Sequence, residues 1–136
     1  MQMTYSQVAG KVPVTVLKLD GNLDGSSYQS VIAAAQSLYD KGTRHLILDL
    51  TNVPYMSSAG IVALQSIAAM LRGEGAPDPD MGWSALHAVE RDLSTGARQP
   101  LKLLNPQPNI DHVLETVGLK SYLEIYTDLN TALASF

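Results

Sequence analysis

The segment LILDLTNVPYMSSAGIVAL, residues 46–64, contains the pattern of a buried strand, a sharp loop and the start of a helix. Its first five residues are almost all apolar, as expected of a strand that is covered on both faces. Pro54 cannot donate a ladder hydrogen bond, so the strand should end before it. From Ile61 onward the apolar residues recur at helical spacing, which predicts a helix from Ser58 to about Arg72.

Two serines, Ser57 and Ser58, stand where this helix begins and its first backbone N–H groups lack partners. A serine hydroxyl at such a position can cap the helix. A phosphate group there would meet the same donors and the positive end of the helix dipole. The residues alone leave both roles open for this pair.

Strands and helices alternate along the rest of the chain, which indicates an α/β protein. Strand patterns cover residues 3–8, 12–19, 44–50, 101–104 and 122–126. Helical spacing covers residues 28–40, 58–72, 110–117 and 129–136. Pro13 marks an edge or the beginning of its strand, and residues 105–109 have turn composition.

The composition limits the classes of protein that the chain can represent. At 136 residues and 46% hydrophobic, it has the length of one domain, residues 1–136, with enough apolar sequence for a core. It contains no cysteine, which excludes disulfides, thiolate metal sites and a cysteine nucleophile. The net charge of −4 argues against direct nucleic-acid binding. No apolar run reaches the roughly 18–20 residues of a membrane span, so we expect a cytoplasmic protein without membrane contact.

Searches for catalytic and metal-binding patterns give no strong candidate. The histidines are scattered and show no metal-binding spacing: His45, His87 and His112. Asp78 and Asp80 lie on a loop without the Gly and distal Glu of a calcium loop. Ser58-Ala59-Gly60 supplies half of a Gly-x-Ser-x-Gly elbow, but Met56 occupies the place of the first Gly. We therefore predict no enzyme activity, no catalytic residue, no metal and no cofactor.

The segment 46–64 resembles the core of the STAS family, which includes the anti-sigma factor antagonists of bacteria. The shared features are a strand ending in Asp-Leu, a polar turn, the pair Tyr55-Met56, and Ser57-Ser58-Ala59-Gly60 before an aliphatic helix start. Aligned on Gly60, the serine that is phosphorylated in the family falls on Ser58, with Ser57 as second choice. The family often has Asp before this serine and Ser or Thr after it, where this chain has Ser57 and Ala59.

A second stretch, LDGNLD at residues 19–24, also resembles the family, in which its last Asp lies near the phosphoserine loop. The alternative for Asp24 is an ordinary carboxylate at the beginning of a helix, favoured by the dipole. The resemblance implies a partner-binding loop made of Asp24, Tyr55, Met56, Ser57, Ser58, Ala59 and Gly60. Gly60 either lets another chain approach the serine or lets its own helix pack on the loop at Leu23-Asp24.

The resemblance implies a fold, a function and partners. The fold is a STAS-like mixed sheet of about five strands with four main helices. Residues 73–99 are then an insertion with one short extra helix, whose Trp83 either contacts a partner or anchors the insertion. The function is that of a binding module that sequesters an anti-sigma factor, which is also the serine kinase that inactivates the module at Ser58. A serine phosphatase restores it.

An alternative from another class is a scaffold that is not phosphorylated. Ser57 in place of Asp is compatible with a loop that no kinase recognises. The domain would then assemble in a signalling complex, or with itself through the Trp83 insertion as a homo-oligomer such as a homodimer.

Overall fold

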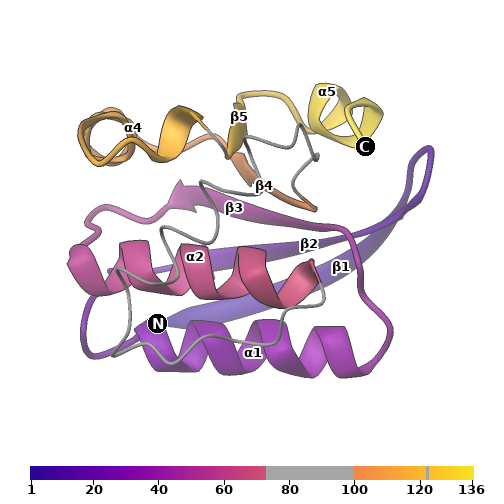
Figure 1. Cartoon of the computed structure of the whole chain (residues 1–136), viewed down its shortest axis with the longest axis horizontal. Helices are drawn as coiled ribbons and strands as arrows, with labels where there is room; N and C mark the ends of the chain where they lie inside the picture. The colour runs from indigo at the N-terminus through magenta and orange to yellow at the C-terminus, as the bar shows by residue number, and fades with distance from the viewer. Residues whose placement is uncertain (73–99, 122) are drawn as a thin grey trace.

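A five-stranded mixed sheet forms the centre of the computed structural model, which describes residues 1–72, 100–121 and 123–136 (Figure 1). The strands follow chain order across the sheet: β1 (Gln2–Ala9), β2 (Pro13–Asp20), β3 (Leu46–Asn52), β4 (Leu101–Leu104) and β5 (Glu124–Tyr126). β1 is antiparallel to β2, and all the other neighbours are parallel. This arrangement confirms the predicted mixed sheet, with the strand of the 46–64 segment in its middle.

The first two strands form a hairpin in unbroken register from Gln2 opposite Asp20 to Ala9 opposite Pro13. Pro13 is the first residue of β2, which is a position where the missing N–H of proline is tolerated. The prediction that Pro13 marks the beginning of a strand is therefore confirmed, although β2 itself lies between two neighbours.

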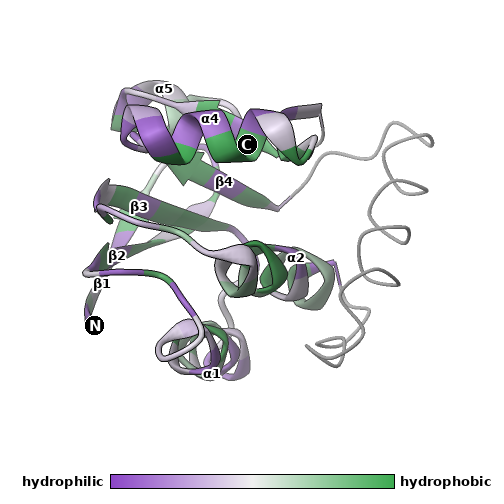
Figure 2. Cartoon of the chain, turned by 90° about the vertical axis from the view of Figure 1, so that its left-hand side faces the viewer, coloured by the Kyte–Doolittle hydropathy of each residue, from purple (hydrophilic) through white to green (hydrophobic). Residues whose placement is uncertain are grey.

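Four α-helices and a short 3₁₀-helix complete the described part of the fold. They are α1 (Tyr28–Asp40), α2 (Ser58–Leu71), α4 (Pro108–Thr116), the 3₁₀-helix η2 (Leu119–Ser121) and α5 (Leu129–Ala134). Figures 1 and 2 show α1 and α2 side by side. The prediction of a turn over residues 105–109 is wrong at its end, because Pro108 occupies the first turn of α4, where its missing N–H costs nothing.

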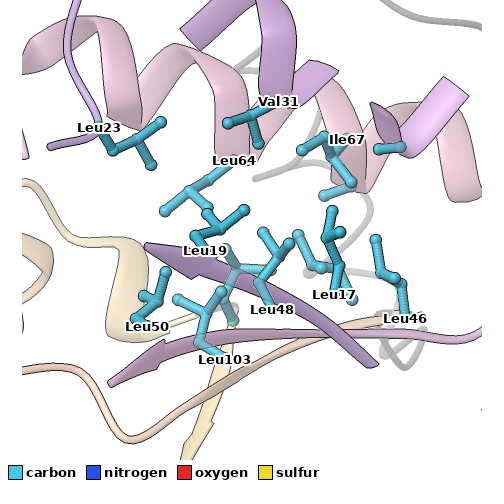
Figure 3. Close-up of a cluster of buried hydrophobic side chains, with 14 of the residues drawn as sticks. Leu17, Leu19, Leu23, Val31, Leu46, Leu48, Leu50, Leu64, Ile67 and Leu103 are labelled. Carbon is cyan, nitrogen blue, oxygen red and sulfur yellow. The ribbon is translucent and has the colours of Figure 1, made fainter. Parts of the chain in front are cut away.

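Alternate residues of β2 face two separate cores. Leu17 and Leu19 belong to the cluster that packs under α1 and α2, whereas Val14 and Val16 pack with Ala132 and its neighbours in α5. Figure 3 shows the first cluster, in which Leu17, Leu19, Leu46, Leu48 and Leu103 from three strands meet Val31, Leu64 and Ile67 from the two helices. Figure 2 shows the hydrophobic residues running along β3 and β4, which are covered on both faces. The loops at the ends of the strands are therefore attached to a sheet that is packed on both faces.

Of the charged side chains that the structure describes, one lies inside the fold. Lys102, on β4, is 1% exposed, and its Nζ lies 2.6 Å from Oε2 of Glu124 on β5. The two residues are register partners in the parallel ladder. The Phe136 ring lies 4.9 Å from the same Nζ and makes an edge-to-face contact with His45. The pair therefore joins β4 and β5 beneath the carboxyl-terminal residues.

Several predictions of the sequence concern residues 73–99 and lie outside the described residues. These are the insertion and its short helix, Trp83, His87, and the carboxylates Asp78 and Asp80.

Candidate functional site

The candidate site lies where the parallel strands end. Because β2, β3 and β4 run in the same direction, the loops that follow them meet at one edge of the sheet. These loops are residues 21–27 before α1, residues 53–57 before α2, and residues 105–107 before α4. The sequence segments that resemble the STAS family, around Asp24 and Ser58, are the first two of these loops.

The first two loops are joined by backbone hydrogen bonds. Leu23 and Met56 form a parallel bridge, in which the Leu23 N–H donates to the Tyr55 carbonyl at 2.9 Å and the Ser57 N–H donates to the Leu23 carbonyl at 3.0 Å. The side chains of Leu23 and Met56 are buried, at 0% and 4% exposed. The loop that carries the serines is therefore fixed to the loop that carries Asp24.

The two serines have different roles at the beginning of α2. Ser57 is the N-cap residue, with extended backbone angles, and its Oγ accepts a hydrogen bond from the Ala59 N–H at 3.3 Å. Ser58 is the first helical residue and is exposed, and its hydroxyl makes no hydrogen bond to the described part of the chain. The geometry thus gives the capping role to Ser57 and leaves the Ser58 hydroxyl accessible.

Gly60 lets α2 pack against the Asp24 loop. A Cβ atom at this position would lie 2.6 Å from Met56 Cγ and 2.9 Å from the Leu23 carbonyl oxygen, which is closer than van der Waals contact allows. Gly60 is buried. Of the two roles open from the sequence, the geometry supports close packing within the chain.

Asp24 forms a tight turn instead of capping α1. Its Oδ1 accepts hydrogen bonds from the Ser26 hydroxyl at 2.6 Å and the Ser26 N–H at 2.9 Å. These bonds stabilise the carboxylate and lower the pKa of Asp24 below its ordinary value. Ser27 is the N-cap residue of α1 by position, but its hydroxyl donates to the Asn22 carbonyl at 2.7 Å and makes no capping bond. The loop therefore presents an ionised carboxylate at neutral pH.

The third loop and the first turn of α4, which the sequence did not assign to the site, hold the end of β3 and the serine loop through amide side chains. The Asn109 side chain donates to the Pro54 carbonyl at 2.8 Å, and the Gln107 side chain donates to the Thr51 carbonyl at 3.0 Å. Asn105 has a φ of 53° and donates to the Thr51 hydroxyl at 3.2 Å. The Asn-Pro-Gln-Pro-Asn composition was a signal for a turn, but the partners lie more than 50 residues away in the sequence.

The outward surface of the site contains an aromatic and a hydroxyl side chain. Tyr55 is 51% exposed, and it directly precedes the buried Met56. Ala59 is half-buried beside Ser58. Of the predicted loop residues, Tyr55 and Ser58 are the most exposed, whereas Met56 and Gly60 hold the loop from inside.

Two hollows in the described surface lie at the other end of the molecule. One, of about 380 Å³, is lined by residues 7–13 of the hairpin, and the other, of about 330 Å³, is lined by residues that include Thr15, Lys41 and Arg44. Within the described ranges, no group of three or more His, Asp or Glu residues is arranged to hold a metal ion. None of the helices described is long and apolar enough to cross a membrane.

The mixed sheet, the helices beside it and the fixed serine loop define the class of protein. The STAS domain model matches residues 5–77, and the chain belongs to the STAS domain family. No curated protein matches the sequence.

Solved structures of low sequence identity share the fold. A proposed anti-sigma factor antagonist from Thermotoga maritima superposes with a TM-score of 0.70 at 17% identity, over 96% of this chain and 90% of that one. An anti-sigma factor antagonist from Mycobacterium paratuberculosis gives 0.62 at 16% identity, over 97% and 92%. The Bacillus cell fate determinant SpoIIAA, in its phosphorylated form, gives 0.51 at 18% identity, over 96% of each chain.

Proposed function

We propose that this protein is an anti-sigma factor antagonist whose binding to an anti-sigma factor is switched off by phosphorylation of Ser58. The observation that carries the proposal is the division of roles between the two serines. Ser57 uses its hydroxyl to cap α2, whereas the Ser58 hydroxyl is exposed at the first position of the helix, three residues after the exposed Tyr55. The fold is shared with anti-sigma factor antagonists, and one of these, SpoIIAA, has also been solved in phosphorylated form; both similarities support the proposal.

The fold tolerates a phosphate group at this position. Phosphorylation adds about −1.5 to −2 charges. The first turn of α2 contains no acidic residue, and the positive end of the helix dipole lies at the same place. We therefore expect phosphorylation to leave the domain folded and to act on the partner.

Between the phosphate and a partner protein, electrostatic repulsion can be large. A doubly negative phosphate about 6 Å from a partner carboxylate is repelled by about 5 kcal/mol at an effective dielectric constant near 20, before salt screening. Every 1.4 kcal/mol changes the affinity about tenfold. Even a third of this repulsion would release a partner that had bound the unmodified loop.

The chain needs no catalytic residue of its own in this function. The anti-sigma factor, acting as a serine kinase, supplies the phosphoryl transfer, and a serine phosphatase removes the group. Tyr55 is the side chain most suited to anchor the partner, because exposed aromatic residues contribute strongly to protein interfaces.

The test is incubation with a serine kinase of the anti-sigma class and ATP, followed by mass-spectrometric mapping of the modified residue. The proposal expects phosphate on Ser58, no labelling of Ser58→Ala, and continued labelling of Ser57→Ala. It also expects Ser58→Asp to lose the anti-sigma factor in a pull-down. Absence of phosphate from both serines, together with unchanged binding by Ser58→Asp, would instead support the scaffold alternative.

A further inference from the structure

Tyr55 is held from two different elements, one on each side of its Cα atom. The carbonyl of the preceding Pro54 accepts a hydrogen bond from the Asn109 side-chain amide, in the first turn of α4, at 2.8 Å. The Tyr55 carbonyl accepts from the Leu23 N–H, in the loop before α1, at 2.9 Å. Because each peptide group is planar, fixing the groups on both sides fixes the direction in which the Tyr55 side chain leaves the backbone.

Ser58 is positioned by the loop before α1. The Ser57 N–H donates to the Leu23 carbonyl at 3.0 Å, and the missing Cβ of Gly60 lets the first turn of α2 approach the same carbonyl. Ser58 lies between these two contacts and belongs to the helix. In the described chain, the Asn109 bond therefore acts on the exposed tyrosine of the site and not on the exposed serine.

The Asn109 side chain serves the loop and not the capping of α4. Asn109 is the second residue of the helix, and the N-cap residue is Gln107, which makes no side-chain capping bond. Asparagine is among the weaker helix formers, so helix propensity does not account for it at this position. The bond to the Pro54 carbonyl, which joins residues 55 positions apart, gives the side chain a specific partner.

The neighbouring amides Asn105 and Gln107 act at a different place. Both donate to Thr51, the first to its hydroxyl at 3.2 Å and the second to its carbonyl at 3.0 Å. Thr51 belongs to β3. Of the three amides, Asn109 is therefore the one that reaches the loop after the strand.

We propose that Asn109 is a positioning residue for partner binding, which holds Tyr55 in the direction that the anti-sigma factor recognises. The inference rests on the proposed function, in which Tyr55 anchors the partner. Without the Asn109 bond, the peptide group before Tyr55 can turn, and ordering the tyrosine again on binding costs affinity. The Ser58 hydroxyl stays where α2 and Leu23 place it, so phosphoryl transfer within the bound complex keeps its rate.

The first test is steady-state phosphorylation by the anti-sigma factor kinase, with ATP saturating and the concentration of the full chain varied. Asn109→Leu keeps the branched shape of the side chain and removes the donor. It is expected to raise the KM for the chain about two- to tenfold and to leave kcat unchanged. Asn109→Gln keeps an amide donor and should recover part of the loss.

The matched control is Asn130→Leu, because Asn130 is an exposed asparagine at the second position of another helix, α5. This variant should leave both KM and kcat unchanged. Tyr55→Ala provides the test of mechanism: in that background, Asn109→Leu should change KM by less than about twofold, because its effect passes through the tyrosine. Independent, multiplying effects of the two substitutions on KM would overturn the proposal, as would a fall in kcat as large as the rise in KM.

A second readout needs no partner. The Tyr55 N–H belongs to the peptide group that Asn109 holds, so backbone amide relaxation in NMR reports on that group directly. Asn109→Leu should lower the order parameter of the Tyr55 amide and leave that of Ser58 unchanged, and equal order at Tyr55 in variant and wild type would overturn the proposal. A wild-type chain that is phosphorylated, with the same KM in Asn109→Leu, would sink this inference alone. A wild-type chain that is neither bound nor phosphorylated would sink the proposed function with it.

Discussion

Gly60 and Leu23 approach each other so closely that a single added carbon would not fit between them. The site of a Cβ on Gly60 lies 2.9 Å from the Leu23 carbonyl oxygen and 3.0 Å from Leu23 Cγ. This contact seats the first turn of α2 on the Asp24 loop. The orientation of the exposed Ser58 therefore depends on a buried residue two positions further along the helix.

Gly60→Ala should destabilise the protein by about 1–3 kcal/mol, because the methyl group has to displace buried atoms. Urea unfolding, followed by circular dichroism, measures this change. Gly25→Ala is the matched control, since a Cβ at Gly25 meets no atom within 4 Å, and it should change the unfolding free energy by less than about 0.5 kcal/mol. Equal effects of the two variants would show that the close contact is absent in solution.

Ser57→Ala should cost about 1 kcal/mol of stability, because the hydroxyl that accepts from the Ala59 N–H is lost. Ser58→Ala should be close to neutral, since the Ser58 hydroxyl has no partner in the described chain. Parallel urea titrations of the two variants make the comparison. A larger loss for Ser58→Ala than for Ser57→Ala would contradict the roles that the structure assigns.

Asp24 should titrate below its ordinary pKa of 3.8, because the Ser26 hydroxyl and the Ser26 N–H both donate to the carboxylate. A folded-state pKa that is lower than the unfolded one means that the stabilisation is complete above pH 3.8 and is lost as the pH falls through the folded pKa. Carbon-detected NMR titration of the carboxyl group measures the midpoint. Ser26→Ala should move the pKa of Asp24 upward, and a wild-type midpoint at or above the ordinary value would refute the assigned cause.

Removing one partner of the Lys102–Glu124 pair should cost more than replacing the lysine with an apolar side chain. Glu124→Gln leaves a buried charge with a neutral partner and should cost about 1–2 kcal/mol, a value reduced by the 45% exposure of the Glu124 side chain. Lys102→Met keeps the volume of the side chain and should cost less. In the double variant, the Glu124→Gln change should have a smaller effect than it has alone, and simple additivity would argue against the pairing.

The sequence was sufficient for the architecture because the apolar patterns in it are long and regular. The apolar run from Leu46 to Leu50 predicted the middle strand, and the helical spacing after Ile61 predicted α2. Both predictions lie within about two residues of the observed bounds. The resemblance to the STAS family, made on Ser57-Ser58-Ala59-Gly60, is confirmed by the family match and the shared fold. The roles of these residues in partner binding stay predictions.

Other features could not be predicted because they depend on residues that are distant in the chain. From the sequence, either serine could have capped α2. In the structure Ser57 is the capping residue, and Gly60 packs against Leu23 in the same first turn. The hydrogen bonds to Thr51 and Pro54 exist only because β4 lies beside β3. Their donors are Asn105, Gln107 and Asn109. The position of β1 at the edge of the sheet likewise follows from the strand order and not from any local pattern. Local sequence determines periodicity and capping chemistry, whereas hydrogen bonds and packing between distant segments exist only in the assembled sheet.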